Sequence, residues 1–154
     1  MTPYASLYAL HVLAALAWVG GMFFAWMILR PAAASLLQAP ERLTLWQGVF
    51  SRFFKWVWAC LIILPISGIG LLHIGMNGFN GMPRYVQLMA GLFVVMAAVF
   101  LRIQLLQLPL LKSAVAMQDW PAGADALGKI RKLVGFNLLL GVAVVIVATT
   151  RVSF

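Results

Sequence analysis

Four long apolar runs constrain the fold of this chain more than any other feature of the sequence. They cover residues 5–29, 56–76, 85–108 and 133–150. An α-helix needs about 20 apolar residues to cross about 30 Å of hydrocarbon, and a helix satisfies its own backbone hydrogen bonds there. The sequence therefore predicts an all-α integral membrane protein, a four-helix bundle that forms a single transmembrane domain over residues 1–154.

The composition agrees with a membrane protein and argues against other classes. Hydrophobic residues make up 64% of the chain and charged residues only 9%, whereas soluble domains carry about 25% charged residues. The net charge of +8 does not indicate a nucleic-acid partner, because the basic residues are spread over short connections and form no groove or arm. We expect the lipid bilayer to be the solvent and no nucleic acid to bind.

The basic residues also predict the orientation of the chain. Four crossings place both termini and the turn at residues 77–84 on one side, together with Arg84 and Arg151. The other nine Lys and Arg residues lie at or near the connections 30–55 and 109–132 on the opposite side. The positive-inside rule then places both long connections in the cytoplasm. We expect a multi-pass protein of the bacterial inner membrane with both termini on the periplasmic side.

The first long connection has a helical pattern of its own. Apolar residues recur at helical spacing after Pro40, at Leu43, Trp46, Phe50 and Phe53, as in an amphipathic helix. We predict a cytoplasmic amphipathic helix over residues 41–55 that continues into the second span. The sequence shows no internal repeat.

Two histidines, His11 and His73, fall within the apolar runs. Ionisable residues inside a membrane are rare and indicate function by default. His11 lies about 9 Å from the outer start of the first span and His73 about 5 Å from the outer end of the second. The two imidazoles are therefore expected in the same outer half of the bilayer, where they are candidates for a shared metal site.

Residues around the histidines favour a b-type heme as the bound group. Trp18 follows His11 by seven residues, and Gly70 precedes His73 by about one helical turn. A small residue beside a histidine leaves a flat slot of the kind that a porphyrin with axial imidazoles occupies, although glycine also serves close helix packing. Arg84 would meet the heme propionates. This hypothesis predicts electron transfer near the periplasmic face, with a quinone or a periplasmic redox partner, and allows a heme-dependent oxidoreductase.

Two further hypotheses remain open from the residues. Copper would use His11 and His73 with the outer methionines Met76, Met82 and Met89, since imidazole and thioether ligands suit Cu(I), although methionine is also an ordinary apolar filler. The third hypothesis is a helical partner subunit without a cofactor. Base rates for oligomers favour a homodimer in each case.

The first span resembles a known family. In residues 10–21, His11 is followed after a six-residue gap by Trp18, Val19 and Gly20. This pattern resembles the opening helix of the copper-resistance protein D (CopD) family and of the related HemJ-type protoporphyrinogen oxidases, and residues 127–151 resemble the closing segment. The resemblance implies copper uptake across the bacterial inner membrane for the first group. For the second group it implies heme b binding and oxidation of protoporphyrinogen, with His11 as the first-helix histidine.

Overall fold

Residues 2–151, which a computed structural model describes, form helices joined by short turns and contain no strand. The first span is α1 (Pro3–Phe24), the π-helix η1 (Ala25–Leu29) and α2 (Arg30–Leu36), and the second is α3 (Ala39–Gly75). A 3-10 turn, η2 (Gly78–Gly81), leads to the third span, α4 (Arg84–Arg102), the π-helix η3 (Ile103–Gln107) and α5 (Leu108–Ala116). The fourth span is α6 (Trp120–Thr150).

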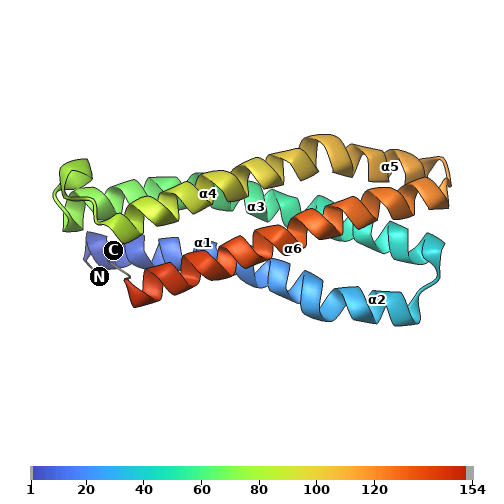
Figure 1. The fold of residues 1–154 in the computed structure, drawn as a ribbon, viewed down its shortest axis with the longest axis horizontal. Helices are drawn as coiled ribbons and strands as arrows, with labels where there is room; N and C mark the ends of the chain where they lie inside the picture. Colours follow the sequence, from blue (N-terminus) through green and yellow to red (C-terminus); the bar gives the residue numbers. More distant parts are fainter. Residues whose placement is uncertain (1, 152–154) are drawn as a thin grey trace.

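These four helical rods pack side by side along their length (Figure 1). Each has 31 to 37 residues and is apolar enough to cross a membrane, which confirms the predicted all-α membrane bundle. The two termini lie at one end, together with the α3–α4 connection at residues 76–83 (Figure 1). We call this the terminal end. We call the other end, at residues 37–38 and 117–119, the basic end.

The helices are longer than a bilayer is thick. At 1.5 Å per residue they measure about 46–55 Å, against about 30 Å of hydrocarbon. Lys55, Arg102 and Lys132 lie 18 to 20 residues from the helix ends at the terminal end, or about 27–30 Å. These cations therefore lie about one hydrocarbon thickness from the terminal end, and the remaining helix length extends beyond them toward the basic end.

The exterior of the bundle is apolar and its core is aromatic. Leu16 and Leu139 expose 64% and 70% of their surface, as expected of side chains that face lipid. Inside, edge-to-face contacts join Phe100 to Phe54 and to Trp18 at centroid distances of 5.2 and 6.5 Å. The amphipathic segment 41–55 supplies part of this core and belongs to the same continuous helix as the second span, which confirms the predicted continuity.

Two wide turns interrupt the first and third spans, and each is followed by a proline. The backbone N–H of Arg30 donates to Ala25, and that of Leu108 donates to Ile103, five residues back in both cases. Pro31 and Pro109 come next. A proline has no N–H, and its ring clashes with the carbonyl four residues earlier in an α-helix, so a wider turn just before it relieves that clash.

The bundle consists of two helical hairpins with the same order of features. The first hairpin comprises α1 to α3 and the second comprises α4 to α6, and the most extensive helix contacts form within each hairpin. In each hairpin a span with a π-helix and a proline leads through a short connection to a long return helix. That return helix carries a proline in its first turn, Pro40 in α3 and Pro121 in α6.

Candidate functional site

His11 and Ser67 form a polar contact between α1 and α3 inside the apolar part of the bundle. Nδ1 of His11 lies 2.8 Å from Oγ of Ser67. Ser67 is 0% exposed, and His11 is half-buried. A Cβ atom on Gly68 would lie 3.3 Å from Cε1 of His11. Glycine at this position therefore allows the imidazole to lie directly against α3.

The hydrogen bonds of Ser67 fix the proton position on His11. The Ser67 hydroxyl has one proton, and Oγ lies 2.6 Å from the carbonyl of Ile63 and 3.2 Å from that of Leu64. Carbonyl oxygens only accept, so the hydroxyl donates to the backbone and accepts from Nδ1–H of His11. The geometry thus assigns the Nδ1–H tautomer. The proton of His11 is then on Nδ1, and the lone pair of the ring is on Nε2, the nitrogen that does not contact Ser67.

His73 presents the same ring nitrogen at the terminal end. Its Nδ1 lies 2.9 Å from the carbonyl of Ile69, one turn back in α3, so Nδ1 carries the proton here as well. The ring of Phe79 meets the imidazole edge-to-face at 5.6 Å. His73 is exposed as a residue, and its Nε2 lies on the side of Gly78, whose Cβ would be 3.8 Å away.

The two imidazoles occupy different faces of α3. Ser67, which holds His11, and His73 are six residues apart, or about 9 Å along the axis and about 120° around it. His73 turns toward η2 through Phe79, whereas His11 lies between α1 and α3. Both lie in the half of the bundle near the terminal end, with His11 deeper, and they do not face each other across one slot.

Gly70 and Trp18 serve packing in this structure. A Cβ on Gly70 would lie 2.8 Å from Cδ1 of Leu7, so the side chain of Leu7 fills the space that we expected to be a slot. Trp18 is 2% exposed and packs edge-to-face against Phe93 and Phe100 at 6.1 and 6.5 Å. Both residues therefore contact apolar side chains of the bundle.

The other predicted site residues gather at the terminal end. Arg84 is exposed and begins α4. Met76 follows the end of α3, Met82 follows η2, and Met89 lies in the second turn of α4. All three methionines are half-buried, at the same end as His73. Their thioethers therefore lie at the level of the more exposed imidazole.

Ser67 is the polar partner of His11 that the sequence analysis missed. It stands in an apolar helix between Pro65 and Gly68, and a lone hydroxyl in such a place was the available signal. Within residues 2–151, no group of three or more His, Cys, Asp and Glu side chains is arranged to hold a metal ion. A metal site here would therefore combine imidazole with other ligands.

Comparison with known proteins supplies the family. The family model for copper resistance protein D matches residues 47–151. The matched range includes Ser67 and His73, whereas the motif in residues 10–21 on which the resemblance rested lies outside it. Comparisons with curated proteins and with solved structures give no significant match. Because the matched range covers more than half of the 154 residues, this multi-pass membrane protein belongs to the copper resistance protein D family.

Proposed function

We propose that this protein binds copper(I) within the membrane and moves it, with Nε2 of His11 as the inner donor atom. The observation that carries the proposal is the hydrogen bond from Nδ1–H of His11 to Ser67. A metal-binding histidine typically donates its other ring N–H to a fixed acceptor, which orients the ring and raises the basicity of the coordinating nitrogen. The Ser67 hydroxyl has this role for His11.

The ligands at the terminal end favour Cu(I) over harder ions. Imidazole and thioether groups suit Cu(I), and His73 shares this end with three methionines. The three Asp and Glu side chains of the chain, Glu41, Asp119 and Asp125, all lie near the basic end, so the terminal end has none of the carboxylate side chains that magnesium and calcium prefer. Copper is the cargo in this proposal. It would enter at His73 and pass to His11, about 9 Å deeper along α3.

The direction of movement follows from the proposed orientation. Nine of the eleven Lys and Arg residues lie toward the basic end, and cytoplasmic connections carry such an excess. We place the protein in the inner membrane of a bacterium with the terminal end in the periplasm. Copper would then approach from the periplasmic side.

Copper titration of the purified protein tests the proposal. In detergent and without oxygen, the protein competes for Cu(I) with the chromophoric chelator bicinchoninate. We expect the wild type to bind Cu(I) and His11→Ala to raise the Kd at least tenfold, with a smaller effect of His73→Ala at the exposed site. Asn80→Ala, an exposed polar residue of η2, is the matched control and should behave as wild type. Unchanged binding in the double histidine variant would overturn the proposal.

A b-type heme is the second candidate for the same Nε2 atom, with electron transfer to a quinone or a periplasmic protein as its function. The Nδ1–H tautomer of His11 also suits an axial ligand of heme iron. The packing argues against a heme held by both histidines, because Leu7 fills the space at Gly70 and the imidazoles lie on different faces of α3. An optical spectrum of the purified protein, oxidised and then reduced with dithionite, separates the candidates. Sharp reduced α and β bands would establish heme, and a featureless spectrum with bound copper would exclude it.

A further inference from the structure

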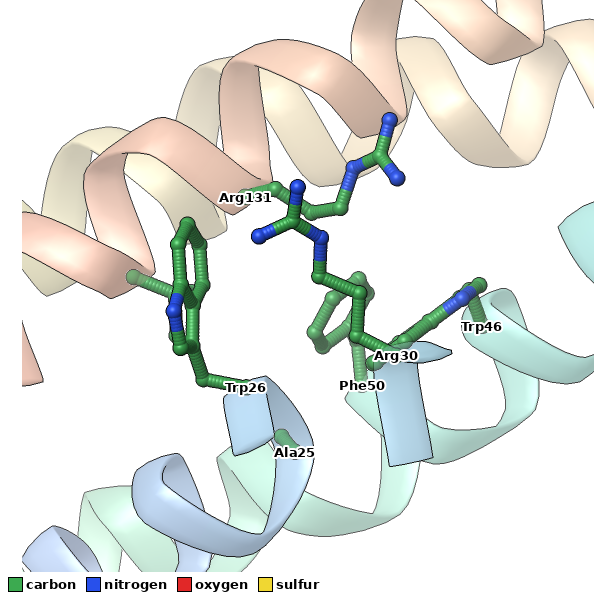
Figure 2. A pocket seen from close by; sticks show the side chains of 7 residues that line it. Ala25, Trp26, Arg30, Trp46, Phe50 and Arg131 are labelled. Atoms are coloured by element: carbon green, nitrogen blue, oxygen red, sulfur yellow. The ribbon is translucent and has the colours of Figure 1, made fainter. Parts of the chain in front are cut away.

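Two arginines from different spans converge at the basic end. Figure 2 shows the side chains of Arg30, at the start of α2, and Arg131, in α6, extending past one another into the same space between the two helices. The guanidinium carbon of Arg30 lies 4.4 Å from the centroid of the Trp26 ring. Both arginines are half-buried. They line a small hollow of about 10 Å³ together with the buried apolar side chains Ala25, Trp46, Phe50 and Val134.

Helix geometry brings the two guanidinium groups to one level. Arg30 lies 27 residues after the start of α1 and Arg131 lies 19 residues before the end of α6, or about 40 and about 28 Å from the terminal end. A helical side chain leans toward the N-terminus of its own helix. The side chain of Arg30 therefore leans toward the terminal end and that of Arg131 toward the basic end, so the two meet between these levels.

The described part of the chain supplies no counter-ion to this pair. Asp125 forms the only ion pair within residues 2–151, with Lys129 at 2.9 Å. Asp119 caps α6 by accepting from Ala122 N at 3.1 Å, and Glu41 borders a separate groove.

A third cation adds to the charge of this site. Arg42 lies close enough, like Arg30, to repel Arg131 electrostatically. Like charges held together beside buried apolar side chains are unfavourable, and an external anion would remove that repulsion.

We propose that Arg30 and Arg131 bind a phosphate group, with Arg42 adding to the positive field. Guanidinium groups match phosphate oxygens through paired N–H donors. The site spans about 28 to 40 Å from the terminal end, from the edge of about 30 Å of hydrocarbon outward into the headgroup layer. Basic pockets between membrane helices on the cytoplasmic side bind anionic headgroups in this way. The phosphate comes from an anionic phospholipid or from free inorganic phosphate.

Native mass spectrometry of the full-length protein in mild detergent tests this site. The probes are phosphatidylglycerol, phosphatidylcholine as the zwitterionic comparison, and inorganic phosphate. We expect one phosphatidylglycerol to bind more tightly than phosphatidylcholine, and Arg30→Gln and Arg131→Gln each to weaken it at least tenfold. Lys112→Gln removes an exposed cation in α5 near the same end and should leave binding unchanged. Circular dichroism checks that each variant keeps the helix content of the wild type, and only variants that do so are compared.

Each outcome decides a separate point. Binding of inorganic phosphate that the two arginine variants lose, without preference for phosphatidylglycerol, would support the phosphate site and assign free phosphate as its source. Wild-type affinity in both Arg→Gln variants would overturn the proposal, and so would an equal loss in Lys112→Gln, because binding would then follow overall charge. If a Gln variant does not fold, Arg30→Lys and Arg131→Lys keep the charge without the paired donors, and wild-type affinity in both would refute guanidinium recognition.

Discussion

Ser67→Ala tests whether one hydroxyl controls the imidazole of His11. In this variant Nδ1–H of His11 loses its acceptor at 2.8 Å. The Ile63 carbonyl loses a donor at 2.6 Å but keeps its backbone partner in the helix. A buried donor left without a partner costs about 1–3 kcal/mol. We therefore expect the free energy of unfolding to fall by about 1 kcal/mol, the low end of this range, because His11 is half-buried and the Leu64 carbonyl offers its ring another acceptor.

The effect on copper affinity should be larger than the effect on stability. Loss of the partner that orients a metal-binding histidine typically lowers metal affinity about 10–100-fold, which corresponds to about 1.4–2.7 kcal/mol. We expect the Kd for Cu(I), measured by competition with bicinchoninate, to rise within this range in Ser67→Ala. Nitrogen-15 NMR of labelled histidine provides the direct readout, since the shifts of the two ring nitrogens report which one carries the proton.

Two serine variants provide the controls. Ser67→Thr keeps a hydroxyl at the same position and should stay within about threefold of wild-type affinity, since one staggered rotamer places Oγ1 near the original site. Ser35→Ala removes a hydroxyl that donates to Ala32 at 3.1 Å at the other end of the bundle and should change nothing. The reasoning would be refuted if Ser67→Ala bound Cu(I) as wild type does and kept the Nδ1–H pattern of ring-nitrogen shifts for His11.

Three further predictions concern packing and topology. Gly70→Ala should lower the free energy of unfolding by about 1 kcal/mol, the low end for overpacking, because its Cβ would lie 2.8 Å from the end of the flexible Leu7 side chain. Gly91→Ala, with nothing within 4 Å, should be neutral or stabilising in the same denaturation assay. Asn137→Leu removes a buried side-chain oxygen without a partner in the described chain. It should raise the free energy of unfolding by about 1 kcal/mol, which is measured as a higher denaturation midpoint. In a cysteine-free background, an impermeant maleimide applied to intact cells should label Asn80→Cys and spare Gln118→Cys, and the reverse pattern would contradict the proposed orientation.

The sequence predicts the four spans because a helix that crosses lipid must be long and apolar, and apolar runs of that length can be seen directly in the sequence. It also predicts the continuous helix α3, since the pattern in residues 41–55 meets the second span without a turn signal. The contact between His11 and Ser67 was beyond sequence reasoning. A helix in lipid is apolar on all sides, so the pattern does not show which face of α1 meets α3. The same ambiguity explains why we expected Gly70 to leave a slot for a porphyrin. In the structure this small residue accommodates the side chain of Leu7.

The hairpin order of the bundle has a consequence for how the protein is made. Both members of the His11–Ser67 contact belong to the first hairpin, which is complete once residue 75 has been synthesised. Membrane helices insert first and associate afterwards, and the N-terminal part of a nascent chain is ordered before the rest. The inner donor atom can therefore be oriented before any residue of α4 leaves the ribosome. The phosphate site has to wait until α6 has been synthesised, because Arg131 belongs to that helix.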